Sequence, residues 1–189
     1  MFLSSGFLAL GGLFNNGNGT LVVIESGSIT NQAALNLINL TSAYRAYFLV
    51  FDNLVPVADN SSLFMRLSDD NGSTFKSGAS DYFTQFNKTV IAIFSSFGTD
   101  ASIMGVADNV GNVASAETVS GHAYLFNPTD SSQKTKVFSS VAYDNNINSF
   151  TSVDNYSMRN VAESNTAFRV FFSGTNIATM NYTLYGLRA

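Results

Sequence analysis

The sequence predicts an all-β protein, an antiparallel sandwich or barrel. Short runs of alternating apolar residues recur along the chain, and clusters of Asn, Asp, Gly and Ser separate them as turns do. Proline is rare, with 2 in 189 residues, so it interrupts few strands. Aromatic residues make up 13% of the chain, and Phe and Tyr favour the pleated, half-buried surface of a sheet.

The chain length of 189 residues suits one domain with a short arm. We predict an N-terminal attachment arm and flexible link in residues 1–20 and a single β-sandwich domain in residues 21–189. The start, MFLSSGFLALGGLF, is apolar, but the first basic residue is Arg45, so the start lacks the charged region of a secretory signal. It is also too short to span a bilayer. We therefore expect it to pack against the chain's own core or a partner.

The strands follow the link NNGNGT. The first is TLVVIESGSI (20–29). In NQAALNLINL (31–40), Ala34, Leu37 and Ile38 share a helical stripe, whereas Leu35 and Leu37 alternate as in a strand; we favour the strand. SAYRAYFLVF (42–51) is apolar on both faces, which predicts a central strand covered on two sides.

Later strands repeat the alternation. Leu63, Met65 and Leu67 share one face of the next segment, and its other face is mixed. Further predicted strands are TVIAIF (89–94), TVSGHAYLF (118–126), TKVFSSVAY (135–143), TAFRVFF (166–172) and IATMNYTLYGL (177–187). The turns between them include FGTD, NPTDSS, YDNNINS and SGTN. The weakly patterned residues 101–117 predict a long loop or a poorly signalled strand pair that packs on a neighbour.

Composition argues against several function classes. Charged residues are 12% of the chain, about half of the roughly 25% usual in soluble proteins. The net charge of −4 argues against nucleic-acid binding, which needs a clustered positive face. The absence of cysteine excludes disulfides and thiolate metal sites. We predict no cofactor.

Signals for catalysis are weak. The single histidine, His122, occupies an alternating strand position, where a packed side chain is the common outcome. No nucleophile-elbow Gly-x-Ser-x-Gly motif occurs, and the acids lie mostly in turns without a distinguishable pair for glycoside hydrolysis. We therefore predict that the chain is not an enzyme.

The stretch SDDNGSTF (68–75) has the spacing Ser-x-Asp-x-Gly-x-Thr-aromatic, which resembles the Asp-box of sialidases. One copy in so short a chain, with five arginines in all, does not fit a sialidase propeller. We predict a hairpin turn in which Asp69 accepts backbone N–H groups and Asn71-Gly72 supplies positive φ. Its residues are Ser68, Asp69, Gly72, Thr74 and Phe75. A weaker hypothesis is a calcium site at Asp69, Asp70 and Asn71, without the closing glutamate of a calcium loop.

Residues 44–86 carry a second resemblance. The F-x-N-L-x-P step (Phe51 to Pro56), the L-x-x-R-x-S core (Leu63 to Ser68) and the closing SGASDY look like a module of virion proteins in tailed bacteriophages. The ending NYTLYGL (181–187) is similar to the last strand of those chains, whereas Phe83 stands where a tryptophan is expected. The resemblance implies a jelly-roll-like β-sandwich that is built into the virion as an oligomer without enzymatic activity.

We therefore expect a structural protein of a virion that is assembled in the bacterial cytoplasm. A capsid decoration, a head fibre or a surface adaptor fits the chain length best. Its expected partners are other virion proteins and copies of itself, with a trimer favoured, and neither nucleic acid nor membrane. The alternative is a glycan-binding tail-fibre module, in which exposed tyrosines stack on host sugars. Its candidate contacts are Tyr82, Tyr124, Tyr143 and Tyr156.

Overall fold

The computed structural model describes residues 20–89 and 93–188. These residues form twelve β-strands in two antiparallel sheets and contain no helix, hence none that could cross a membrane. The predicted all-β sandwich is therefore confirmed, and the barrel is not formed. Residues 1–19 of the predicted arm and residues 90–92 of the predicted strand TVIAIF lie outside the described part of the chain.

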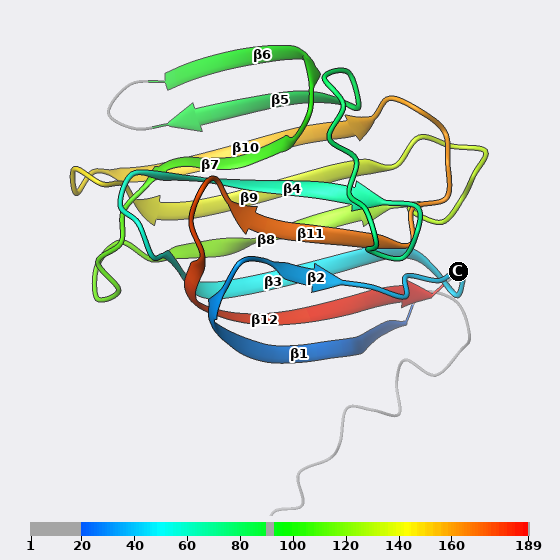
Figure 1. Ribbon diagram of the computed structural model, residues 1–189, viewed down its shortest axis with the longest axis horizontal. Coiled ribbons are helices and arrows are strands. Elements are labelled where there is room, and N and C mark those ends of the chain that lie inside the picture. Colours follow the sequence, from blue (N-terminus) through cyan, green and yellow to red (C-terminus); the bar gives the residue numbers. More distant parts are fainter. Residues whose placement is uncertain (1–19, 90–92, 189) are drawn as a thin grey trace, which may run out of the picture.

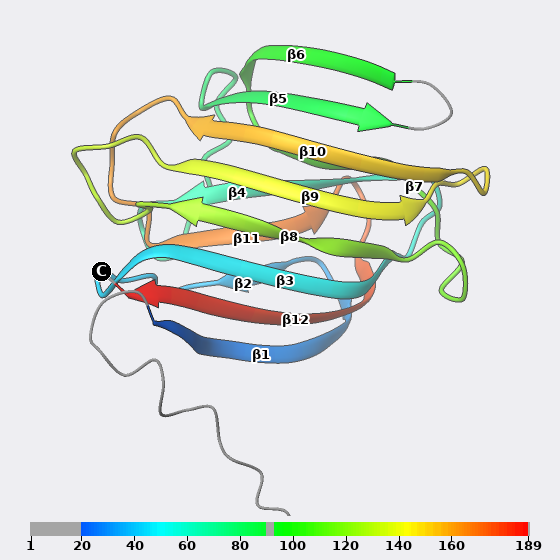
Figure 2. The same cartoon turned by 180° about the vertical axis from the view of Figure 1, so that it is seen from behind.

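The two sheets differ in size and lie face to face (Figures 1 and 2). The large sheet has the order β1 (Leu21–Gln32), β12 (Ile177–Arg188), β3 (Tyr44–Pro56), β8 (Val119–Phe126), β9 (Lys136–Asp144), β10 (Phe150–Arg159), β5 (Tyr82–Thr89) and β6 (Ile93–Ala101). The small sheet has the order β2 (Leu35–Leu37), β11 (Ala167–Phe172), β4 (Ser61–Ser68) and β7 (Met104–Val110). Each sheet therefore has an inner face toward the other and an outer face.

The core lies between the inner faces, where alternate residues of the strands meet. Leu63, Met65 and Leu67 of β4 are at most 1% exposed, as their alternation predicted. Opposite them lie Leu49 of β3 and Leu125 of β8, which belong to the same cluster and are fully buried. Burying each such side chain contributes about 1.5–3 kcal/mol, so this cluster fixes which face of every strand points inward.

Strand β3 differs from its prediction. Tyr47, Leu49 and Phe51 face the core, but Phe48 and Val50 lie on the outer face, where Val50 is 37% exposed. No second layer of the described residues covers that face (Figure 2). The prediction that both sides of this strand are covered is therefore wrong, and the apolar outer residues of β3 face outward.

Two uncertain segments are resolved by their pairing. Residues 35–37 of the ambiguous segment 31–40 form β2, which pairs with β11, so the strand prediction is confirmed for these three residues, while residues 31–32 end β1. The weakly patterned segment 101–117 contains β7, which pairs with β4 and packs against β5, β9 and β10. The predicted turn FGTD is instead part of β6.

Asparagine supplies the unusual backbone conformations of the turns. In the described part of the chain, every non-glycine residue with positive φ is an asparagine, with φ between 49° and 61°. These residues are Asn31, Asn39, Asn53, Asn60, Asn71, Asn109, Asn127 and Asn148. Asn tolerates the left-handed region because its short polar side chain bonds locally. The high Asn content therefore serves the turns as well as the solvated surface.

Candidate functional site

A row of aromatic side chains crosses the outer face of the large sheet. Antiparallel register places Tyr185 of β12 opposite Phe48 of β3, Phe48 opposite Tyr124 of β8, Tyr124 opposite Phe138 of β9, and Phe138 opposite Tyr156 of β10. Together with the adjacent His122 and Phe126 of β8, these residues are called the aromatic face. It spans five neighbouring strands of the sheet.

The rings of the aromatic face contact one another directly. Phe48 and Tyr124 stack with their centroids 4.3 Å apart and an interplanar angle of 11°. Phe138 lies 5.3 Å from Phe126 and 5.3 Å from Tyr156. Such pairs hold each other in place and each adds about 0.5–1.5 kcal/mol beyond simple burial. The rings therefore form a preorganised surface.

The aromatic face remains open on its outer side. Tyr124, Phe138 and Tyr156 are 37%, 41% and 45% exposed. Beside them is a depression of about 290 Å³. Its lining consists of Leu21, Ala46, Tyr47, Phe48, Tyr124, Phe126, Phe138 and Leu187. Contiguous apolar surface of this kind marks binding and assembly sites in soluble proteins.

The structure separates the four tyrosines that were predicted as glycan contacts. Tyr124 and Tyr156 are exposed on the aromatic face, as a stacking role requires. Tyr82 and Tyr143 are 0% and 3% exposed and point into the sandwich, so their prediction as surface contacts is wrong. The two pairs occupy opposite faces of the same sheet, which sequence alternation alone did not assign.

The two buried tyrosines serve the fold. The Tyr82 hydroxyl accepts the N–H of Leu67 at 2.8 Å and donates to the Lys76 carbonyl at 3.2 Å. The Tyr143 hydroxyl donates to the Asp108 carbonyl at 2.7 Å. Burial raises the pKa of Tyr82 to about 12 and raises that of Tyr143 further. The Tyr82 hydroxyl therefore joins β5 to β4 and to the loop that follows β4, and the Tyr143 hydroxyl joins β9 to β7 of the other sheet.

The stretch 68–75 forms a tight turn, but Asp70 rather than Asp69 organises it. The Asp70 carboxylate accepts the Ser68 hydroxyl at 2.7 Å, the Thr74 N–H at 2.8 Å and the Thr74 hydroxyl at 2.6 Å. The hydrogen bonds from Ser68 and then Thr74 lower the pKa of Asp70 to about 2. Gly72, at φ 88°, donates its N–H to the Ser68 hydroxyl. Ser68, Gly72 and Thr74 therefore take part in the hydrogen bonds of this turn, and Asn71 and Gly72 have positive φ.

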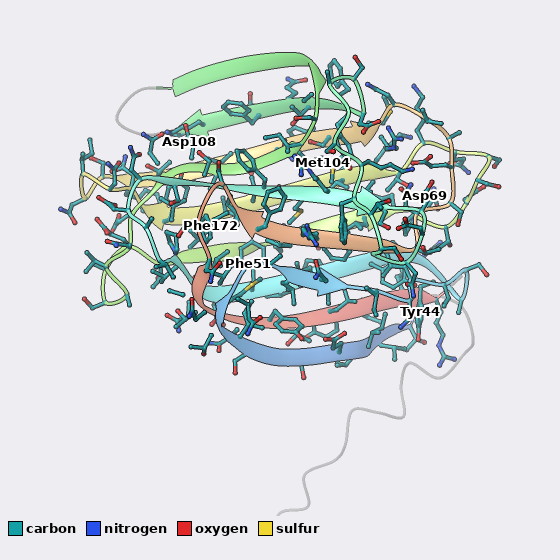
Figure 3. The ribbon with its side chains drawn as sticks, in the orientation of Figure 1. Tyr44, Phe51, Asp69, Met104, Asp108 and Phe172 are labelled. Carbon is teal, nitrogen blue, oxygen red and sulfur yellow. The ribbon has the colours of Figure 1, made fainter. Side chains whose placement is uncertain are left out.

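Asp69 has a different role from the one predicted. Its carboxylate pairs with the Lys76 ammonium at 2.6 Å, outside the turn. Asp69 itself is labelled in Figure 3. The turn also does not close a hairpin, because β4 belongs to the small sheet and the next strand, β5, belongs to the large one. Phe75 lies against Arg169 of β11, whose guanidinium carbon is 4.0 Å from the ring centroid. The stretch is therefore a corner between the sheets.

The three residues of the calcium hypothesis do not share a ligand sphere. Asp69 pairs with Lys76, and Asp70 bonds groups of its own turn. The Asn71 side chain accepts the backbone N–H of Asn39 and donates to the Asn39 side-chain oxygen. Within residues 20–89 and 93–188, no cluster of three His, Cys, Asp or Glu side chains could hold a metal ion. The turn is thus satisfied by protein groups.

The motif SGASDY fastens the loop before β5 to the end of β10. Asp81 accepts the Gly78 N–H and the Arg159 guanidinium, at 2.5 and 2.9 Å. Arg159 is 4% exposed, and its Nε donates to Glu163 at 2.7 Å. An arginine so buried needs both carboxylates and the Asp81 carbonyl, which it also contacts at 2.7 Å. These motif residues therefore maintain the fold.

His122 lies among rings rather than beside an acid. Its imidazole packs edge-on against Phe48 and Tyr124, with centroid distances of 5.6 and 5.4 Å. General base catalysis requires a neighbour that orients the imidazole and a nucleophile within hydrogen-bond reach. The aromatic environment fits the packed role that its strand position predicted.

Comparisons with known proteins give no family. No family model matches the chain, and no curated protein matches it. Galectin LEC-6 of Caenorhabditis elegans is similar at 12% identity and a TM-score of 0.34, over 82% of this chain and 94% of the galectin. The exo-inulinase of Aspergillus awamori is similar at 10% identity and a TM-score of 0.40, over 88% of this chain and 29% of the enzyme.

A fructosyltransferase from A. japonicus is similar at 10% identity and a TM-score of 0.31, over 91% of this chain and 26% of the enzyme. The chain therefore spans less than a third of either enzyme's length.

Sequence reasoning missed most of the aromatic face. Of its residues, only Tyr124 and Tyr156 were predicted as binding contacts, whereas Phe48, Phe138 and Tyr185 were assigned only to strands. Cross-strand pairing joins them, and pairing depends on strand order. The sequence nevertheless held a signal for this face, because HAYLF places the rings of His122, Tyr124 and Phe126 at alternate positions of one short strand, β8.

Proposed function

We propose that the chain is a non-enzymatic structural protein of a bacteriophage particle, a capsid decoration or a head-fibre or surface adaptor. The sequence supports this through the virion-like module in residues 44–86 and the ending NYTLYGL. In the structure these segments include β3, β4 and β12, with Leu49, Leu67 and Leu184 in one core. The resembling segments are thus the scaffold of the sandwich.

The observation that carries the proposal is the open aromatic face. A chain with 12% charged residues displays five cross-strand rings on one side of its larger sheet. Interface cores are enriched in aromatic residues and depleted of charge. A surface that is ordered and apolar before it meets a partner loses little side-chain entropy on binding. These properties suit stable attachment.

The edge of the large sheet offers a second attachment surface. On edge strand β1, Leu21, Val23 and Ile24 are 51%, 56% and 40% exposed. Exposed apolar edge strands tend to pair or pack with other chains unless they are blocked. We include in the proposal that the chain is a homo-oligomer, with a trimer favoured, held through this edge and residues 1–20 and assembled in the bacterial cytoplasm.

Incorporation into particles tests the proposal. Phage particles are produced with the wild-type chain, with Tyr124→Ser combined with Phe138→Ser, or with Ile147→Ser as a control. Ile147 is 71% exposed in the turn between β9 and β10, so its replacement removes apolar surface away from the aromatic face. We expect occupancy, measured by quantitative mass spectrometry of purified particles, to fall for the double variant only.

Three results would count against the proposal or one part of it. Absence of the wild-type chain from purified particles would remove the virion assignment. Normal occupancy of the double variant would remove the aromatic face from attachment. Normal occupancy after deletion of residues 1–20 would remove the arm from attachment, and analytical ultracentrifugation of the purified chain reports the oligomeric state.

A glycan-binding module is the second candidate, favoured by the exposure of Tyr124 and Tyr156. Sugars place their apolar faces on aromatic rings and bond through their hydroxyls to nearby polar groups. Gln85 of β5 lies opposite Tyr156 and extends the row with an amide. Glycan-array binding that is lost in Tyr124→Ala and Tyr156→Ala supports this function, whereas a signal-free array with the folded protein refutes it.

A further inference from the structure

Two arginines face each other on the outer face of the small sheet. Antiparallel register places Arg66 of β4 directly opposite Arg169 of β11. Both side chains are partly exposed, and their strand neighbours Met65, Leu67 and Val170 point into the core. Directly opposite residues of an antiparallel pair have Cβ atoms roughly 4.5–5.5 Å apart, and like charges there destabilise a sheet.

Each guanidinium is fixed from one side. The Nε of Arg66 donates to the Ser102 carbonyl at 3.1 Å, and its guanidinium carbon is 5.1 Å from the Phe171 ring centroid. The Nε of Arg169 donates to the Asn36 side-chain oxygen at 2.8 Å, and its guanidinium lies over Phe75. In the described part of the chain, the terminal Nη groups of both residues have no hydrogen-bond partner.

The other partly buried cations of the chain are neutralised differently. Lys76, Lys88 and Arg159 each pair with a carboxylate, at 2.6, 2.6 and 2.9 Å. Among the described residues, neither Arg66 nor Arg169 pairs with one. Burial, and then the charge of Arg66, lower the pKa of the Arg169 guanidinium. The pair is thus an uncompensated positive site on an acidic protein.

We propose that Arg66 and Arg169 bind the oxyanion of an acidic saccharide that comes from outside the chain. Two guanidinium groups with free Nη donors match a carboxylate or phosphate, which binds such groups through two parallel hydrogen bonds. An anion between them would also remove the repulsion that the sheet register imposes.

The surroundings favour a saccharide as the carrier of that anion. One row along the same face, Phe171 and Phe64 lie opposite each other with ring centroids 5.9 Å apart, and both are partly exposed. On the other side of the pair, Asn36 is exposed and offers an amide. Rings for the apolar face of a sugar and an amide for its hydroxyls therefore flank the charged centre. This inference does not depend on the aromatic face, which belongs to the other sheet.

Isothermal titration calorimetry at low salt tests the proposal with four probes. They are an oligogalacturonate, a neutral oligosaccharide of similar length, inorganic phosphate and an acidic peptide. We expect the oligogalacturonate to bind the wild-type chain, and the neutral sugar to bind more weakly. Arg66→Gln and Arg169→Gln are each expected to weaken oligogalacturonate binding about tenfold or more, because each removes charged hydrogen bonds. Arg45→Gln, which removes an exposed charge from β3, is the matched control.

The titrations can overturn either the binding site or its assignment to a saccharide. No oligogalacturonate binding, or equal weakening in Arg45→Gln, overturns the proposal. Phosphate binding without oligogalacturonate binding overturns the saccharide assignment, as does a stronger response to an acidic peptide used as a fourth probe. Circular dichroism and Tm show whether the variants fold. If the glutamine variants unfold, Arg66→Lys and Arg169→Lys replace them, since lysine keeps the charge but loses the guanidinium fork.

Discussion

Removal of the Tyr82 hydroxyl is expected to weaken the whole sandwich. In Tyr82→Phe the ring stays in its fully buried position, but the buried N–H of Leu67 loses its 2.8 Å acceptor. An unsatisfied buried donor costs about 1–3 kcal/mol. The longer bond to the Lys76 carbonyl, at 3.2 Å, is also lost. We expect a total of about 2–3 kcal/mol, because that carbonyl is only partly shielded from water.

Thermal unfolding measures this loss. For a chain of this size, 1 kcal/mol corresponds to about 2–4 °C in Tm, so Tyr82→Phe should lower Tm by about 4–12 °C. Tyr156→Phe is the matched control, because it removes the same atom from a side chain that is 45% exposed. Its free energy of unfolding should change by less than about 0.5 kcal/mol. Equal Tm values for the two variants would refute the role of the Tyr82 hydroxyl as a buried acceptor.

The pH dependence gives an independent check. Burial raises the pKa of Tyr82 from 10.0 to about 12, so the folded chain keeps a proton that the unfolded chain loses above pH 10. The stabilisation that this hydroxyl provides is complete below pH 10 and is lost as the pH rises toward 12. The difference in Tm between the wild-type chain and Tyr82→Phe should therefore narrow between these values.

Three further substitutions test the loops. Asp70→Asn should lower Tm at neutral pH and reduce the change of Tm with pH in acid. The pKa of Asp70 is lowered from 3.8 to about 2 in the folded chain, so the stabilisation by this carboxylate is lost as pH falls from 3.8 toward 2. The control Asp69→Asn should leave the acid dependence of Tm unchanged. Gly72→Val should cost about 1–3 kcal/mol in urea unfolding, since φ is 88° and a Cβ would lie 3.1 Å from Ile38; an unchanged midpoint would contradict this. Arg159→Met should lower the free energy of unfolding by about 3–5 kcal/mol, because it leaves the carboxylates of Asp81 and Glu163 without their cation. A loss below about 1 kcal/mol would show that water replaces the guanidinium.

The sequence predicted strands best where apolar residues alternate. β4, β8, β9 and β12 have an apolar residue at most inward positions, and each was located. β10 was missed because its inward positions include Thr151, Asn155 and Ser157, which are buried but polar. Asn155 and Ser157 bond each other and the hydroxyl of Thr84 on β5. Alternation of hydrophobicity does not report a strand whose core side is a hydrogen-bond network.

The candidate sites were harder to predict than the strands. Asp69 and Asp70 are neighbours of the same type, and only the three-dimensional turn decides which carboxylate lies inside it. Arg66 and Arg169 are 103 positions apart in the sequence. They meet because β4 and β11 are neighbours in the small sheet, which no local sequence pattern reports. Register between distant strands also creates the aromatic face. Local sequence therefore supplies the side chains of a surface, and topology decides which of them meet.

The asparagines with positive φ have a consequence for recognising related chains. At these positions glycine adopts the same backbone conformation, whereas a β-branched residue is strained there. Relatives with little overall identity should therefore alternate between Asn, Gly and Asp at Asn53, Asn60, Asn71 and Asn127, while the strands between them vary freely. The spacing of these positions along the chain can therefore guide the alignment of diverged sequences whose other residues are no longer similar.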